Sequence, residues 1–92
     1  MVSPRFSMGL VVATPGALRA LEESGDHVLD LLFRHVAGDW GDLDEEDKAE
    51  NELSLREGFR LLSAYTLKSG EKIWIITEAD RSVTTLLLPD EY

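Results

Sequence analysis

The last third of the chain contains three runs rich in β-branched and aromatic residues, at 59–67, 72–78 and 83–88. Such runs are typical of β-strands. The links between them, 68–71 and 79–82, have the length of hairpin loops. The sequence therefore predicts an antiparallel meander of three strands, or a sheet of four strands if the apolar run 9–13 joins an edge.

Three short helices are expected before these strands. Thr14 followed by Pro15 marks the start of the first, because threonine caps a helix and proline at the first helical position loses no hydrogen bond. Asp26 is expected to cap the second, whose apolar residues repeat at the helical period. That face consists of Val28, Leu31, Leu32 and His35, widened by Leu29, Phe33 and Val36. We therefore predict an α+β fold in which three N-terminal helices pack on a three- to four-stranded antiparallel sheet.

The third helix is expected within an acidic stretch, residues 39–57. This stretch holds nine of the eighteen carboxylates and two bases, in a chain whose net charge is −9. Asp44 is expected to cap the helix, Gly58 to end it, and Ala49 and Leu53 to provide its core contacts. The carboxylates expected to face solvent as a binding surface are Asp42, Asp44, Glu45, Glu46, Asp47 and Glu50.

Three interpretations of this acidic stretch compete. It could be a solvated helix face with a well-charged N-terminus. It could bind a basic protein surface by imitating the phosphate track of DNA, which carries one charge per about 1.7 Å. It could hold a hard cation, but the loop pattern D-x-D-x-D-G is absent, so no metal site is predicted.

The size and composition describe one soluble domain spanning residues 1–92, with residues 1–8 expected as a flexible tail. The apolar fraction is 43%, and there is no cysteine, which excludes disulfides and thiolate metal sites. The apolar runs are too short to span a membrane. The negative charge disfavours direct binding of nucleic acid and of anionic membranes. We expect a cytoplasmic protein without a cofactor.

His35, Asp39 and Asp42 are the candidate catalytic group. A histidine with nearby carboxylates can act as a general acid or base. The spacing matches no established ligand motif, and His35 lies on the apolar face of its helix. The competing interpretation is a structural histidine bonded to a carboxylate, with Trp40 anchoring the turn that follows.

A second constellation lies in the strands. A sheet surface that bears arginine, tyrosine and an acid can serve as a nuclease platform, with Glu78 or Asp80 as the base. The competing interpretation assigns these residues to the core and to turns. The constellation comprises Arg60, Ser63, Tyr65, Trp74 and Thr77, with Arg81, His27 and His35 as further candidates.

Both faces of the expected meander carry large apolar groups. Ile73 and Ile75 point to one face, and Trp74 and Ile76 to the other. A chain of this length supplies few elements to cover both faces. We therefore expect a homodimer through the sheet.

Several segments are similar to small stand-alone bacterial proteins described as plasmid-related, some labelled as associated with type I restriction systems. These segments are His35 to Gly41, Asp47, Asn51, RLLSAY at 60–65 and IWIITEADRSVTTLLLP at 73–89. The resemblance covers most of the chain from Gly9 onward. It implies a mobile-element context and brings no catalytic residues. We expect a small acidic interaction protein that imitates DNA and binds a basic nucleic-acid-handling protein. The alternative is a small hydrolase or nuclease that uses His35 with nearby carboxylates.

Overall fold

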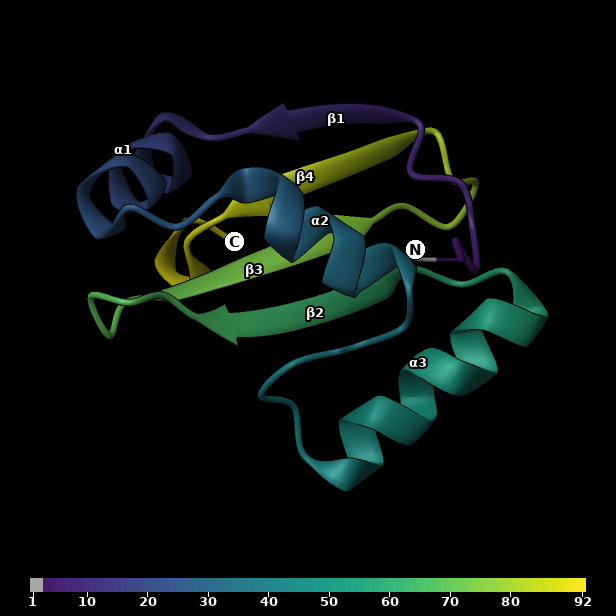
Figure 1. Ribbon diagram of the computed structural model, residues 1–92. Coiled ribbons are helices and arrows are strands. Elements are labelled where there is room, and N and C mark those ends of the chain that lie inside the picture. Colours follow the sequence, from purple (N-terminus) through teal and green to yellow (C-terminus); the bar gives the residue numbers. More distant parts are fainter. Residues whose placement is uncertain (1–2) are drawn as a thin grey trace.

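The computed structural model describes residues 3–92 and has an α+β fold with three α-helices and a four-stranded mixed sheet (Figure 1). The elements in chain order are β1 (Leu10–Ala13), α1 (Pro15–Ser24), α2 (Val28–Val36), α3 (Glu45–Glu57), β2 (Leu61–Thr66), β3 (Lys72–Thr77), β4 (Val83–Leu87) and the short 3-10 helix η1 (Pro89–Glu91).

The sheet has the strand order β1-β4-β3-β2. The antiparallel meander of β2, β3 and β4 is confirmed. However, β1 pairs in parallel with β4, so the expectation of a purely antiparallel sheet is wrong. The expectation that all helices precede the sheet is wrong too, because β1 precedes α1. The helices between β1 and the meander supply the long connection that a parallel pair requires.

The ends of the helices follow the predicted caps in part. The Thr14 hydroxyl accepts from the Ala17 backbone N–H at 3.1 Å, as expected for the N-cap of α1. The N-cap of α2 is His27 instead of Asp26. The Asp26 carboxylate accepts from the Lys68 backbone N–H at 2.8 Å, so it ties the start of α2 to the β2–β3 turn.

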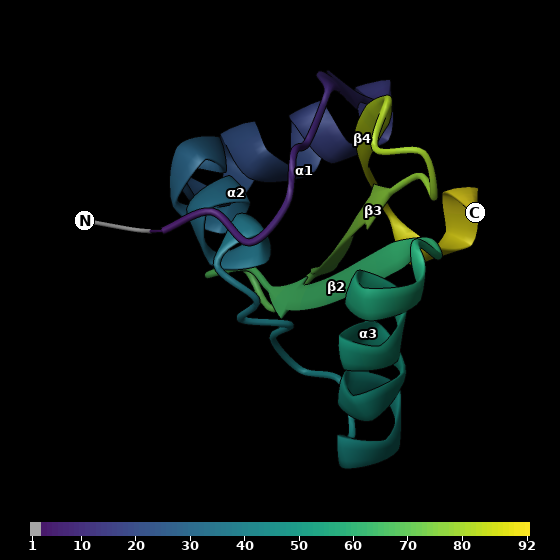
Figure 2. The same ribbon diagram turned by 90° about the vertical axis from the view of Figure 1, so that its right-hand side faces the viewer.

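The main core lies between one face of the sheet and the helices α1 and α2, which cover it together (Figure 2). The helices contribute five buried residues, Ala17, Ala20, Leu21, Leu31 and Leu32. The strands and the residues that directly follow them contribute Tyr65, Leu67, Ile73, Ile75, Leu86 and Leu88. Leu29 and Phe33 were expected to widen the buried face of α2 but remain 57% and 47% exposed. The buried face of α2 is therefore narrower than its apolar sequence.

The opposite face of the sheet is only partly open. Ile76 and Leu87 are buried there, while Trp74 is half-buried and packs edge-on against Tyr92 at 5.7 Å between ring centroids. Ile75 is fully buried on the helix-covered side. The sheet faces thus offer less apolar surface for a second copy than the sequence suggested.

Residues 3–8, which we expected to belong to a tail, pack onto the fold. The Arg5 backbone N–H donates to the Val36 carbonyl at 2.8 Å. The Phe6 ring stacks on Trp40, with centroids 6.3 Å apart, and Met8 packs against the core. Residues 1 and 2 lie outside the described residues.

Candidate functional site

The acidic helix α3 lies beside the outer edge of β2 (Figure 2). The Asp44 carboxylate accepts from the Asp47 backbone N–H at 2.8 Å, which confirms Asp44 as the N-cap. All six carboxylates expected to form a binding surface are exposed: Asp42, Asp44, Glu45, Glu46, Asp47 and Glu50. We call these six residues the acidic surface.

The side of α3 that faces the sheet is polar. The buried residues of the helix are Asn51 and Ser54, whereas Ala49 is exposed and Leu53 is 38% exposed. The prediction that Ala49 and Leu53 form the core contacts is therefore wrong. The Asn51 side chain bonds both backbone groups of Leu62, donating to its carbonyl at 2.6 Å and accepting from its N–H at 3.1 Å. A buried amide thus replaces the apolar stripe by which most surface helices are held.

A second polar contact holds the middle of α3. The Glu52 carboxylate accepts two bonds from the Arg5 guanidinium, at 2.8 and 2.9 Å, and one from the Trp40 indole N–H at 2.9 Å. The bonds from Arg5 and then Trp40 lower the pKa of Glu52 from 4.5 to about 2. Trp40 is buried, as an anchor of this turn should be. Sequence reasoning did not find this clamp, because its members are far apart in the chain.

Arg81 fixes the C-terminal end of α3. Its guanidinium donates to the carbonyls of Ser54, Phe59 and Glu78, at 3.2, 2.7 and 3.1 Å. The Ser54 carbonyl also accepts from the Gly58 and Phe59 N–H groups, and a cation is favoured there by the negative end of the helix dipole. Arg81 also adopts a left-handed backbone conformation, with φ of 62°. This arginine, expected as a surface or turn residue, therefore links the β3–β4 turn to the helix.

The carboxylates of the acidic surface differ in how they are neutralised. Asp42 lies 3.7 Å from the Lys72 ammonium and accepts from Thr66, and Glu45 lies 3.8 Å from Lys48. Within residues 3–92, the carboxylates of Glu46, Asp47 and Glu50 have no ion-pair or hydrogen-bond partner. These three charges therefore face solvent directly.

His35 belongs to a buried chain of hydroxyl groups. Its Nδ1 lies 2.6 Å from the Ser63 hydroxyl and its Nε2 lies 2.9 Å from the Thr77 hydroxyl. Thr77 is 2.7 Å from the Thr84 hydroxyl, which donates to the Met8 carbonyl at 2.7 Å. The Met8 carbonyl at the end of this row can only accept, so Thr84 donates to it and Thr77 donates to Thr84. The Thr77 hydroxyl must then accept from His35, so Nε2 carries the proton and Nδ1 accepts from Ser63.

The burial of His35 has a chemical consequence. The ring is fully inaccessible to solvent, and burial, followed by the positive charge of Arg81, lowers the pKa of His35 from 6.5 to about 4. The imidazole is therefore neutral at neutral pH and both of its nitrogens are occupied. This arrangement stabilises the fold and leaves no ring nitrogen available to a substrate.

The structure does not bring His35 together with the two aspartates proposed as its partners. The Asp39 carboxylate pairs with the Arg34 guanidinium at 2.7 Å and accepts from the Gly41 N–H, and the Arg34 bond lowers the pKa of Asp39. Asp42 pairs with Lys72, as described above. The hydroxyls of Ser63, Thr77 and Thr84 take the place expected for carboxylates.

The strand constellation is divided between the two faces of the sheet. Ser63, Tyr65 and Thr77 are fully buried, on the helix-covered side. Trp74 lies on the opposite face, and Arg60 lies over the Tyr92 ring at 5.5 Å. Among the expected bases, Asp80 accepts from the Ser82 N–H and hydroxyl within the β3–β4 turn. A nuclease platform on one face is therefore not formed.

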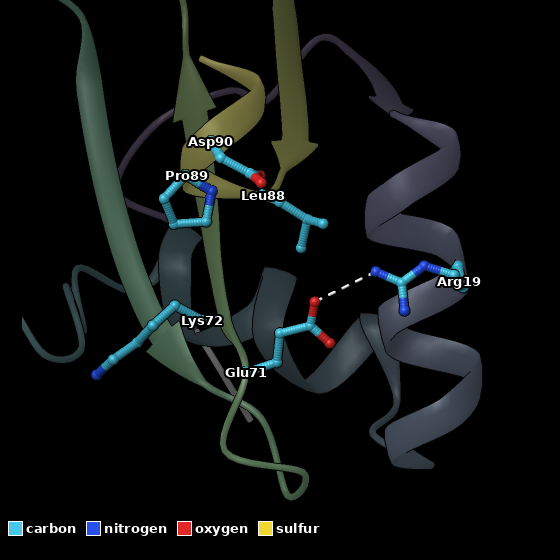
Figure 3. Close-up of a pocket in the computed structure, with 6 residues that line it drawn as sticks. All are labelled: Arg19, Glu71, Lys72, Leu88, Pro89 and Asp90. Atoms are coloured by element: carbon cyan, nitrogen blue, oxygen red, sulfur yellow. Dashed lines mark hydrogen bonds and ion pairs between the residues drawn. The ribbon is translucent and has the colours of Figure 1, made fainter.

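An open hollow of about 300 Å³ lies between α1, the start of β3 and η1 (Figure 3). It is lined by Arg19, Glu71, Lys72, Leu88, Pro89 and Asp90. The Arg19 guanidinium points toward Glu71, 3.2 Å away, and also pairs with Glu23 at 2.9 Å, whereas Lys72 extends away from both (Figure 3). Arg19 and Glu71 neutralise each other, and the lining holds two bases and two acids, so this hollow is a weaker candidate than the acidic surface.

Across residues 3–92, no three histidine or acidic side chains are grouped closely enough to hold a metal ion. In the same residues no helix combines the length and the apolarity needed to cross a bilayer. No protein-family model matches the chain, and neither a curated protein nor a solved structure matches it.

Proposed function

We propose that this chain is a small acidic interaction protein that uses the acidic surface of α3 to bind a basic surface of a nucleic-acid-handling protein. The observation that carries the proposal is the arrangement of α3. The carboxylates of its N-terminal half are exposed, while polar contacts from Asn51, Glu52 and Ser54 hold its middle and C-terminal part. The outward face is therefore fixed in position and unobstructed by the rest of the described chain.

The density of charge on this helix supports a partner that binds phosphates. Five carboxylates lie in the seven residues from Asp44 to Glu50, which cover about 10 Å at 1.5 Å per residue. This corresponds to about one negative charge per 2 Å, close to the value of about 1.7 Å for duplex DNA. A basic groove that neutralises a phosphate track would meet a similar charge density here.

The resemblance to plasmid-related proteins supports the same proposal. A mobile element benefits from a protein that occupies the DNA-binding surface of a host factor. Such a protein must present negative charge without itself binding DNA, and the net charge of −9 meets that condition.

The test compares three tagged forms of the chain as bait in a lysate of the native host. The first is wild type, and the second carries Glu45→Gln, Glu46→Gln and Glu50→Gln. The third is a control with the same change in charge outside α3, made at the exposed acids Glu22→Gln, Asp30→Asn and Glu78→Gln.

The expected result is a basic protein that wild type and the control retain and the α3 variant loses. Duplex DNA should displace it, and salt should weaken its binding, since exposed charges are screened beyond about 8–10 Å at physiological ionic strength. Circular dichroism of each bait checks that α3 remains helical. Retention of the same proteins by all three baits would refute the proposal.

A further inference from the structure

The two edges of the sheet differ in how their backbone groups are occupied. At the β2 edge, Asn51 bonds both backbone groups of Leu62. Ala64 donates to the Trp40 carbonyl at 3.2 Å and accepts from the Asp42 N–H at 2.7 Å. The edge is thereby closed to another strand, as most exposed edges in natural proteins are.

At the β1 edge, two residues direct their backbone groups away from the sheet. Leu10 N–H donates to Ser82 and Thr14 N–H donates to Leu86, so alternate residues of β1 face β4. The backbone N–H and C=O groups of Val11 and Ala13 therefore point away from the sheet. Within residues 3–92, their N–H and C=O groups have no hydrogen-bond partner.

The side chains of β1 itself are apolar and uncharged. Leu10 is 65% exposed, and Val11 and Val12 are each 39% exposed. Residues 9–18 contain no charged side chain. The lysines, inward-pointing charges and prolines that usually protect an edge are absent from β1. In Figure 1, β1 is the outermost strand, and no element of the described chain lies beyond it.

We propose that a second copy of this chain pairs with β1 across this edge. An antiparallel pair about a two-fold axis at Val12 places Val11 opposite the partner's Ala13, and Ala13 opposite the partner's Val11. Residues that face each other in this way exchange two hydrogen bonds. The pair thus uses every outward group of both strands, and Val12 packs against the partner's Val12.

The distribution of charge favours a second copy at this edge. The acidic helix α3 lies at the β2 edge, which is the edge of the sheet farthest from β1. Pairing through β1 joins two uncharged segments and keeps the two acidic helices at the far ends of a continuous sheet. This separation limits the repulsion between two chains that each carry a net charge of −9. The interface is small, so association depends on concentration.

The test uses the whole chain. Sedimentation equilibrium from about 1 µM to about 1 mM measures association over the range of weak complexes. Hydrogen exchange followed by NMR at the two extremes measures protection of individual amides. Wild type should dimerise, and the amides of Val11 and Ala13 should exchange more slowly at high concentration. A monomer at every concentration, or a dimer that leaves these two amides unprotected, would overturn the proposal.

Val11→Pro supplies a specific variant, because it removes an outward N–H without removing a bond to β4. Val11→Ala is its control, since it changes the same side chain, removes more of its apolar surface than proline does, and keeps the N–H. The dissociation constant of the dimer should rise at least about tenfold for Val11→Pro relative to Val11→Ala, the change expected for lost hydrogen bonds. Equal constants for two folded variants would contradict the proposed register. If Val11→Pro does not fold, the exchange experiment on wild type decides.

Discussion

Protonation of His35 should destabilise the fold at mildly acidic pH. The buried ring accepts from Ser63 and donates to Thr77, which requires its neutral form. Burial and the charge of Arg81 lower the pKa of His35 to about 4 in the folded state, whereas the ordinary value is 6.5. The unfolded chain therefore binds the proton first as the pH falls. The free energy of unfolding should be highest above pH 6.5 and should decrease until the pH reaches about 4.

The size of this effect follows from the two pKa values. Their difference of about 2.5 corresponds to about 3 kcal/mol, at about 1.4 kcal/mol per pKa unit. About 2 kcal/mol of this total should be lost between pH 7 and pH 5. The carboxylate with the largest shift acts at lower pH, because the pKa of Glu52 is lowered from 4.5 to about 2 and its contribution to stability is lost as the pH falls from 4.5 to about 2. The interval from pH 7 to 5 therefore isolates His35.

Urea unfolding at pH 7, 6 and 5, followed by tryptophan fluorescence, measures this dependence. His35→Gln should lower the free energy of unfolding at pH 7 by about 1–2 kcal/mol through lost buried hydrogen bonds. The same variant should then vary little between pH 7 and 5, because the titrating group is gone. His27→Gln, at an exposed histidine, is the control and should keep the wild-type dependence. If His35→Gln retains the wild-type slope, the reasoning about the buried ring is refuted.

Two further substitutions test how α3 and the following segment are held. Asn51→Ala leaves both backbone groups of Leu62 unpaired, so urea unfolding should show a loss of about 2–3 kcal/mol. Asn51→Asp keeps an acceptor for the Leu62 N–H but turns a buried carboxylate toward the Leu62 carbonyl, so its loss at pH 7 should be at least as large; wild-type stability in either variant would contradict the double role of the amide. Gly41→Ala should lower the thermal midpoint more than Gly58→Ala. Both glycines have similar positive φ angles, 77° and 75°, but a Cβ at Gly41 would collide with the Ala64 carbonyl, while Gly58 has open space around it. Equal midpoints would show that the collision is relieved.

Local signals in the sequence predicted the elements well. The meander was predicted because strand-forming runs alternated with loops of hairpin length. The caps at Thr14 and Asp44 were predicted because capping depends on residues three positions apart. Exposure of the acidic surface followed from the same reasoning, because charged side chains are rarely buried without partners.

Contacts between distant residues could not be predicted in this way. Nothing local indicates that Asn51 docks α3 through an amide, so Leu53 was the more natural choice for the core. The two hydroxyl partners of His35 lie on β2 and β3, the next hydroxyl in the row lies on β4, and these small polar side chains carry no periodic signal. The alternation of β2 does place Ser63 on the same face as Tyr65, which was the available signal. The parallel pairing of β1 depends on the path of the intervening helices.

The pairing of β1 with β4 also determines when the fold can be completed during synthesis. Leu10 pairs with Val83, and Ala13 with Leu86, so both partners are separated by most of the chain. A ribosome adds about 5–20 residues per second. At that rate β1 emerges about 4–15 s before β4. During this interval the apolar strand has neither its partner in the sheet nor the core beneath it, because the meander that will receive it is made after it. The nascent chain therefore carries one unpaired apolar strand until β4 has left the ribosome.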